Sequence, residues 1–186
     1  MVYTREKAIE LLNRYLKNKN LVKHCIASGV IMRALAIKFG RDKIKWELAG
    51  LLHDIDVELT KEKPQEHTKK AVEILTKEGL DNDIIEAIKM HNSDVWGYKS
   101  DDFFHIALRA SETVTGLIVA AVLVLPDKKL SSLTLDFLLK RFNEKRFAQG
   151  ARRDIILECE KLGITLPENL EIAINAMKEL SVELGI

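Results

Sequence analysis

The chain has 186 residues, 47% of them hydrophobic, and its 29 Lys and Arg residues nearly balance 28 Asp and Glu residues to leave a formal net charge of +1. This length supports one sizeable hydrophobic core, so we expect a single domain over residues 1–186. The charge balance excludes a sequence-wide electrostatic attraction to nucleic acid or to a membrane surface, and we expect neither partner.

The cysteines, the N-terminus and the longest apolar run all favour a cytoplasmic protein. Cys25 and Cys159 lie far apart and belong to no CxxC pattern, which fits a reducing compartment. The N-terminal "MVYTREKAIELL" is charged from its fifth residue and lacks an apolar signal core, so we expect no secretory leader. The apolar stretch 114–126 is shorter than the roughly twenty residues of a membrane span and is expected to form a buried core helix.

Apolar residues recur at helical spacing from the start of the chain. Thr4 is the expected N-cap of a first helix over about 5–17, and a second helix follows the polar "NKN". Asp42 is the expected N-cap of a third helix, whose apolar face runs into His53 and Asp54. The following "ELTKEKPQEH" is expected to be a loop, so the His-Asp pair closes a buried helix.

The rest of the chain also has a helical pattern, and no segment has a convincing strand pattern. We predict an all-α helical bundle of about eight or nine helices, with a metal-site core at about 4–125 and a C-terminal helical extension at about 126–186. The further helices are expected over 66–78, 81–91, 102–125, 132–141, 151–162 and 168–184, with breaks at Gly79, Pro126, Gly150 and Gly163.

The histidines are distributed as metal ligands would be. All five precede residue 126, and four occupy comparable places near the ends or apolar edges of successive predicted helices. A helical bundle can bring such side chains to one interior point, where imidazole and carboxylate together suit iron, manganese, cobalt or zinc. Neighbours on a helix point about 100° apart, so a metal between them explains why His53 and Asp54 are adjacent. The Asp54 carboxylate has two oxygens and is able to bridge two metals.

Four stretches together resemble the HD superfamily of metal-dependent phosphohydrolases. They are "HCIASGVIMRALA" with His24, "LAGLLHDID" with His53 and Asp54, "EHTKKAVEIL" with His67, and "IIEAIKMHN" with His91. A lone His-Asp pair is weak evidence, but the ordered set is specific. The resemblance covers about 4–125, and "PDKKL" and "KRFNEKRFAQGARR" further on are similar to a group of uncharacterised HD-domain predicted hydrolases.

The resemblance implies a set of metal ligands. The first metal would be held by His24, His53, Asp54 and Glu112, and a second by His67 and His91 with Asp54 bridging. Glu112 departs from the family pattern, which has Asp at this place. The HD-GYP members commonly carry a further His where this chain has Asn92, and the GYP motif is absent, which argues against a cyclic di-GMP phosphodiesterase. The metal count is therefore open between one and two.

The implied activity is hydrolysis of a phosphoester or phosphoanhydride by metal-activated water, with Mn, Fe, Zn, Co or Mg as the divalent ion. The expected substrate is a phosphorylated small molecule, foremost a nucleotide. Asp54, His67 and His91 are the expected catalytic residues, the two histidines binding phosphate or relaying a proton if no second metal is present. Arg109, one turn before Glu112, is the foremost phosphate-binding candidate among Lys23, Lys61, Lys63, Arg109, Lys128, Arg152 and Arg153.

Several features have a simpler interpretation, and the function has an alternative. His105 is expected to be structural, and Asp56 and Glu58 to lie in a solvated turn. The basic segment 140–153 is interpreted as an amphipathic helix and a Gly-broken turn that can line a pocket, rather than as a nucleic-acid patch. Trp96 is interpreted as packing, although it is placed to cover a ring at a pocket mouth. The alternative function is a non-catalytic nucleotide-sensing or metal-stabilised binding module.

Overall fold

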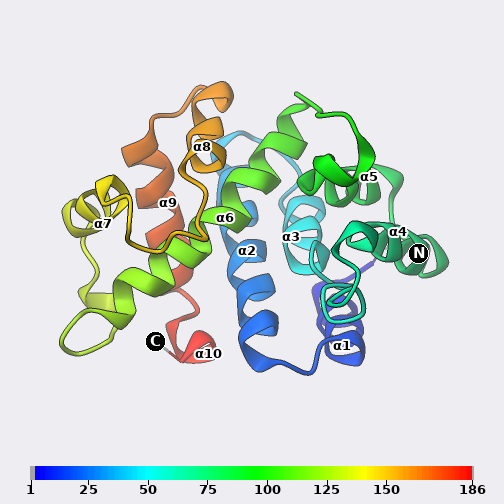
Figure 1. Ribbon diagram of the computed structural model, residues 1–186, viewed down its shortest axis with the longest axis horizontal. Helices are drawn as coiled ribbons and strands as arrows, with labels where there is room; N and C mark the ends of the chain where they lie inside the picture. Colours follow the sequence, from blue (N-terminus) through cyan, green and yellow to red (C-terminus); the bar gives the residue numbers. More distant parts are fainter. Residues whose placement is uncertain (1–2, 186) are drawn as a thin grey trace.

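The computed structural model describes residues 3–185, which contain α-helices and short 3-10 segments and no strand, so the expected all-α fold is confirmed (Figure 1). The expectation about a secretory leader rests in part on residues 1 and 2, which lie outside the described range. The α-helices are α1 (Arg5–Tyr15), α2 (Lys19–Lys38), α3 (Lys43–Leu52), α4 (Lys69–Lys77), α5 (Asn82–His91), α6 (Phe103–Leu123), α7 (Leu135–Asn143), α8 (Arg153–Ile156), α9 (Leu166–Lys178) and α10 (Ser181–Leu184). The 3-10 segments are η1 (Pro64–Glu66), η2 (Ser93–Trp96), η3 (Leu130–Ser132) and η4 (Leu157–Leu162).

Residues 3–185 contain ten α-helices, more than the expected eight or nine, because the helix predicted over 168–184 is divided into α9 and α10. The segment 151–162 continues from α8 into η4, and the segment 168–184 is interrupted at Leu180, which has non-helical backbone angles. The helix expected from 66 begins only at Lys69, since Thr68 has φ 71° and interrupts a right-handed helix. The expected caps are present: Thr4 accepts from the backbone N–H of α1, and Asp42 from that of α3.

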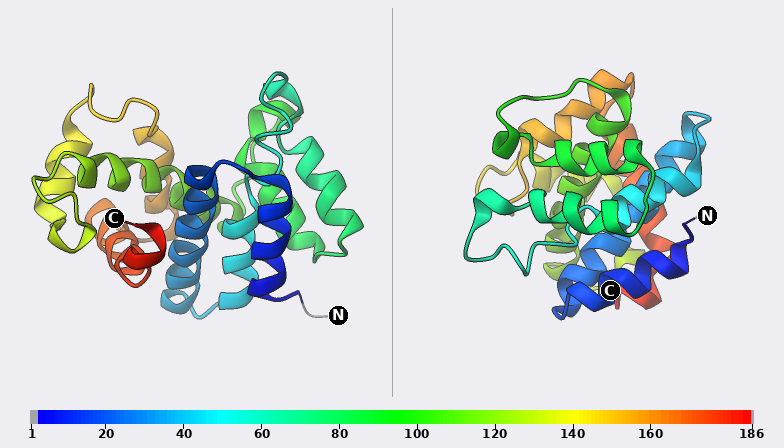
Figure 2. Two further views of the ribbon diagram at one scale, coloured as in Figure 1. Left: turned by 90° about the horizontal axis from the view of Figure 1, so that it is seen from below. Right: turned by 90° about the vertical axis from the view of Figure 1, so that its right-hand side faces the viewer.

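Helices α2 and α6 form the centre of the molecule and cross each other (Figure 1). The helices α1, α3, α4 and α5 lie on one side of this pair and the C-terminal helices α7 to α9 on the other, as Figure 2 also shows. By length and composition alone α2 and α6 could cross a membrane, but 50% and 67% of their apolar windows are buried, as in core helices of soluble proteins. Buried side chains of both sides belong to one continuous hydrophobic cluster.

The closest crossing in the core joins α2 to α3 through two glycines. A Cβ added to Gly50 would lie 2.6 Å from the Ser28 carbonyl oxygen and 2.7 Å from the Gly29 Cα, both of them backbone atoms. One added to Gly29 would lie 2.9 Å from Leu51 Cγ. The two helix backbones therefore meet at a distance that no side chain allows. His24 lies five residues before Gly29 on α2, and His53 lies three residues after Gly50, so both histidines lie next to this crossing.

The glycine crossing predicts a large effect of Gly50→Ala. The added methyl meets backbone rather than a flexible side chain, so the free energy of unfolding should fall by about 3 kcal/mol, the upper end of overpacking effects. Gly116→Ala in α6 is the matched control, because its Cβ would meet no atom within 4 Å and should leave the protein as stable or up to about 1 kcal/mol more stable. Urea unfolding followed by circular dichroism measures both; equal stability of the two variants would contradict the close crossing.

The fold also predicts unreactive thiols. Cys25 and Cys159 are both free and fully buried, and burial raises the pKa of Cys25 well above its usual value and that of Cys159 to about 11. At pH 8 only about one Cys159 thiol in a thousand is then ionised, and the thiolate is the reactive form. Native protein should therefore react slowly with a disulfide reagent such as DTNB. Urea-unfolded protein should react at both cysteines before the first absorbance reading after mixing.

Candidate metal centre

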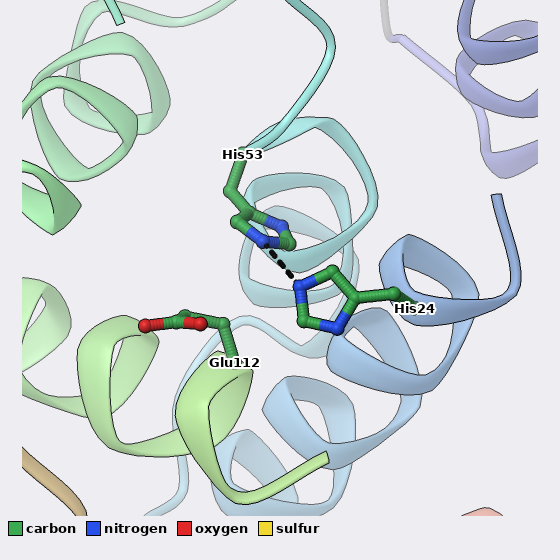
Figure 3. A group of neighbouring side chains, drawn as sticks. All are labelled: His24, His53 and Glu112. Carbon is green, nitrogen blue, oxygen red and sulfur yellow. Dashed lines mark hydrogen bonds between the residues drawn. The ribbon is translucent and has the colours of Figure 1, made fainter. Parts of the chain in front are cut away.

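Six residues named by the sequence patterns come from five segments of the chain and meet at one largely buried point. His53 is the C-cap of α3, Asp54 follows it, and the ends of η1 and α5 supply His67 and His91. His24 comes from α2 and Glu112 from α6, and Figure 3 shows His24 and His53 facing each other with the Glu112 side chain beside them. Two sets of possible ligands have donor atoms within 4.8 Å of one another: His24, His53 and Glu112; and His53, Asp54 and His91.

The Asp54 carboxylate lies between two pairs of imidazoles. Its Oδ2 is 3.4 Å from His53 Nε2 and 3.6 Å from His24 Nε2. Its Oδ1 is 3.3 Å from His67 Nε2 and 3.4 Å from His91 Nε2. Each carboxylate oxygen thus faces one pair of ring nitrogens, which is the arrangement required of a carboxylate that bridges two metal ions.

Backbone carbonyls fix the ring orientation of two of the histidines. The Nδ1 of His53 is 2.8 Å from the Gly50 carbonyl oxygen, and the Nδ1 of His91 is 2.6 Å from the Ile88 carbonyl oxygen. A carbonyl oxygen only accepts, so each Nδ1 carries the hydrogen and donates it. In the neutral ring, Nε2 then has a free lone pair, which is directed toward Asp54.

Side chains fix the ring orientation of the other two histidines, His24 and His67. His24 Nδ1 lies 2.7 Å from Thr115 Oγ1, whose hydroxyl donates to the Glu112 carbonyl oxygen at 2.6 Å and so accepts from the ring. His67 Nδ1 donates to Asp56 Oδ1 at 2.7 Å. All four imidazoles are therefore held with Nδ1 outward and Nε2 inward, as partners behind metal-bound histidines generally hold them.

This donor set fits a divalent metal. The Nε2 atoms of His24 and His53 are 3.1 Å apart, the contact drawn as a dashed line in Figure 3. Since both rings donate through Nδ1, two Nε2 lone pairs face each other unless a cation or a proton lies between them. Imidazole nitrogens with a carboxylate are ligands for Zn, Fe, Mn or Co, so the residues suit the expected ion.

The pKa values describe the centre before a metal binds, when His67 still carries a proton near pH 7 that a metal ion would displace. Burial and then the charge of His53 lower the pKa of His24 to about 4, so this ring is neutral near pH 7. Burial opposes ionisation of Asp54, but His53 and hydrogen bonds from the ring nitrogens hold its pKa well below the usual value. Burial also opposes the charged form of His67, but hydrogen bonds to Asp54 and Asp56 outweigh it and raise the pKa to about 9. The centre therefore holds an ionised carboxylate in a shielded interior.

Glu112 lies in the ligand group despite its departure from the family pattern. Its carboxylate shares a group with His24 and His53, and its Oε1 accepts from the Thr113 hydroxyl at 2.5 Å. Burial raises the pKa of Glu112 and thereby favours its neutral form. A nearby cation would have the opposite effect and favour the ionised carboxylate. The structure thus brings Glu112 to the place where its role as a ligand was expected, and that role remains a prediction.

A cavity of about 440 Å³ adjoins the centre. One wall holds the candidate ligands His24, His67, His91 and Glu112, and another comes from the C-terminal extension, which the sequence had placed outside the metal-site core. The remaining lining residues are Asn92, Ser93, Asp94, Lys99, Arg109, Thr113, Gly116, Gly150, Ala151, Arg152 and Ile155. The basic segment 140–153 therefore contributes to the pocket, as the sequence suggested.

Arg109 is buried at the cavity wall and is only partly paired. Its Nε donates to Glu158 Oε2 at 2.8 Å and its Nη2 to the Ser100 carbonyl oxygen at 3.0 Å. Its Nη1 has no hydrogen-bond partner among the described residues. Lys99 also binds Glu158 and lines the cavity, but its loop position gave no sequence signal. Of the other cations singled out from the sequence, only Arg152 lines the cavity.

The prediction that Asp56 lies in a solvated turn is wrong. Asp56 is fully buried, and its second oxygen accepts from the Ala71 backbone N–H at 2.9 Å while the first holds His67. Glu58 is half-buried and accepts from two backbone N–H groups at the start of α2. An acidic run after a helix has the same sequence pattern whether it is solvated or buried, so the sequence carried no signal that Asp56 orients the His67 ring.

Trp96 and His105 are structural in their contacts. Trp96 does not line the cavity; its Nε1 donates to Thr68 Oγ1 at 2.8 Å and holds a residue that has φ 71° next to His67. A positive φ is rare for a β-branched residue, so this bond supports a strained turn at the site. His105 Nδ1 lies 2.8 Å from Ser100 Oγ, and the ring is outside both ligand groups.

The hydrogen bond from His67 to Asp56 predicts that replacing Asp56 lowers metal affinity, although Asp56 is not itself a candidate ligand. Asp56→Asn keeps the size of the side chain but cannot accept from both His67 and Ala71, so His67 loses its orientation and affinity for Mn²⁺ or Zn²⁺ should fall roughly 10–100-fold. Glu62→Gln, at an exposed position of the same turn, is the matched control. Competition with a chelating dye measures both, and an unchanged affinity of Asp56→Asn would remove Asp56 from the centre.

Comparisons with known proteins identify the family of this chain. A family model described as HD domain matches residues 21–124, more than half of the chain. The chain is 31% identical to Ribonuclease Y of Malacoplasma penetrans over 78 residues, which are 42% of this chain and 17% of that protein. It is 35% identical to Ribonuclease Y of Staphylococcus epidermidis over 77 residues, 41% of this chain and 15% of that protein. The matched segments are thus a small part of these relatives, and no solved structure gives a significant match. The chain belongs to the HD-domain family of metal-dependent phosphohydrolases.

Proposed function

We propose that this protein hydrolyses a phosphoester or phosphoanhydride bond of a compact phosphorylated molecule, foremost a nucleotide, with two divalent metal ions. The observation that carries the proposal is the Asp54 carboxylate, whose two oxygens each face a pair of inward-directed Nε2 atoms. A single metal would use one pair and leave the other two rings to bind phosphate or relay a proton, whereas two metals use both pairs in the same way.

The residues divide between the two ions. His24, His53 and Glu112 would hold the first, His67 and His91 the second, and Asp54 both. When bound, such ions lower the pKa of a coordinated water and neutralise phosphate charge. The protein fixes the four rings from behind through carbonyl, hydroxyl and carboxylate partners, so the ligand positions are set before substrate arrives.

Arg109 would bind and orient the phosphate. Its guanidinium is buried and fixed through Nε and Nη2, and its residue lines the cavity wall that Glu112 shares. Its Nη1 has no partner among residues 3–185 but is covered by protein atoms, so a phosphate would reach it only after neighbouring side chains shift. A donor held this way loses little entropy when it binds a phosphate oxygen, and the buried location strengthens the interaction. Lys99 adds a second positive charge to the same wall.

The cavity favours an enzyme over a metal-stabilised or sensing module. Structural metal sites are closed by protein ligands, whereas catalytic sites keep a position open to water and substrate. Here His24, His67, His91 and Glu112 line a cavity of about 440 Å³, so solvent and a ligand reach the centre. This volume falls within the range of small-molecule sites.

RNA cleavage is a second candidate, since both relatives are named Ribonuclease Y. Those matches cover 15–17% of the relatives, and the polynucleotide activity in their name belongs to whole proteins of which this chain spans a small part. A walled cavity and a net charge of +1 favour the compact substrate.

Elemental analysis and turnover test the proposal together. Protein reconstituted with Mn²⁺, Fe²⁺ or Zn²⁺ should bind about two ions per chain, and His91→Ala about one, because the second pair of nitrogens is broken. His105→Gln, which changes a histidine outside the centre, is the control and should keep both ions. The metal-loaded protein should hydrolyse bis(p-nitrophenyl) phosphate or a nucleotide in preference to an oligoribonucleotide.

Three results would count against it. One ion that is retained in His91→Ala but lost in Glu112→Ala would replace the two-metal centre with a one-metal centre. Two ions without turnover of any phosphoester or phosphoanhydride would favour the binding module. Preferential cleavage of the oligoribonucleotide would select the RNA candidate.

A further inference from the structure

The side chain of Arg153 is bonded to the backbone of its own neighbourhood to an unusual extent. A guanidinium has five N–H donors, and those of Arg153 reach five different carbonyl oxygens at 2.5–3.4 Å. The acceptors belong to Arg141, Phe142, Phe147, Ala148 and Ala151. Every donor is used within the protein, so Arg153 is a positioning residue and not the phosphate-binding cation that the sequence allowed.

The five carbonyls belong to the end of α7 and to the loop that leads to α8. This loop has little regular structure of its own, and Ala148 has φ 44°, which residues other than glycine rarely adopt. The guanidinium also lies 5.8 Å from the centre of the Phe142 ring. A strained loop without a helix or sheet ladder depends on such added bonds to keep one conformation.

The clamped loop forms a wall of the cavity. Gly150, Ala151 and Arg152 line it, together with Ile155 from α8, and the metal ligands line the same cavity from other elements. This wall lies beyond residue 124, where the HD family match ends. The family match therefore accounts for the metal centre but not for the surface that a substrate meets beside it.

We propose that the loop 144–152, clamped by Arg153, is the substrate-selecting wall of this cavity and restricts it to compact phosphorylated molecules. The inference rests on the proposed function. Arg152 carries the wall's positive charge; its guanidinium is 60% exposed and pairs with Asp154, which leaves further N–H donors for a substrate anion. A polynucleotide would need this wall to move aside, because its chain continues on both sides of the cleaved bond.

Arg153→Lys is the most informative substitution. Lysine keeps the charge but offers three donors without the planar fork, so it cannot hold five carbonyls. The KM for bis(p-nitrophenyl) phosphate should rise roughly tenfold or more while kcat changes less than about threefold, since the metal centre is untouched. The preference for this compact substrate over a ten-residue oligoribonucleotide should narrow in the same variant. Trypsin should cleave after Lys145 or Arg146 faster than in the wild type.

Two further variants make the experiment specific. Lys140→Gln is the control, because Lys140 is an exposed cation in α7, outside loop 144–152, and does not line the cavity; its KM should equal that of the wild type. Arg152→Gln tests the wall where the clamp is intact, and its exposed position favours normal folding even if Arg153→Lys unfolds. It should also raise KM with little change in kcat.

The outcomes separate the wall from the proposed function. If the loop becomes trypsin-sensitive in Arg153→Lys but the KM is unchanged, the wall does not select the substrate, and the proposed hydrolase function still stands. An unchanged KM in Arg152→Gln would have the same meaning. Loss of bound metal in Arg153→Lys would also overturn the wall proposal, because the change in KM would then arise at the metal centre. If the wild type has no turnover, the proposed function fails. The wall is then judged by calorimetric binding of adenosine 5′-monophosphate to the Mn²⁺-loaded protein: weaker binding in both variants supports it, and equal binding overturns it.

Discussion

The convergence of four imidazole nitrogens on the Asp54 carboxylate is the constraint on which the rest of the structure depends. An ionised carboxylate inside an apolar bundle is costly unless its oxygens are matched, and lone pairs that face one another at 3.1 Å need a positive charge. No single helix supplies these groups, because neighbouring side chains on a helix diverge. The chain instead ends α3, η1 and α5 at this point and brings α2 and α6 past it.

Helix packing makes the convergence possible. The glycine crossing of α2 and α3 brings two histidines together, and the His53 ring is in turn oriented by the Gly50 carbonyl oxygen. Along α6, Arg109, Glu112 and Thr115 recur every three residues, and each contacts the cavity or an imidazole. α6 also packs on the C-terminal helices, so one helix joins the metal centre to the wall of the pocket.

The sequence predicted the parts that follow from local pattern. Helical spacing, the caps at Thr4 and Asp42, and the order of four histidines were enough for the all-α fold and for the residues that meet at the centre. It did not predict Asp56 or Lys99, since a buried carboxylate and a wall lysine have the same local pattern as solvated ones. The role of Arg153 also differs from the phosphate-binding role that the sequence allowed. The five carbonyls that it binds are spread over residues 141–151 and become its partners only when the loop folds around it.

Chemistry and selectivity are thus encoded in different parts of the chain. The family match and the metal ligands lie before residue 125, where the spacing of ligands is dictated by what a metal accepts. The cavity's other wall depends on contacts within residues 141–155, which a metal does not constrain. A wall of this kind can change without disturbing the ligands, so proteins that share the centre need not share a substrate. Similarity to Ribonuclease Y over 77 or 78 residues, which are 15–17% of those proteins, therefore does not identify the substrate of this chain.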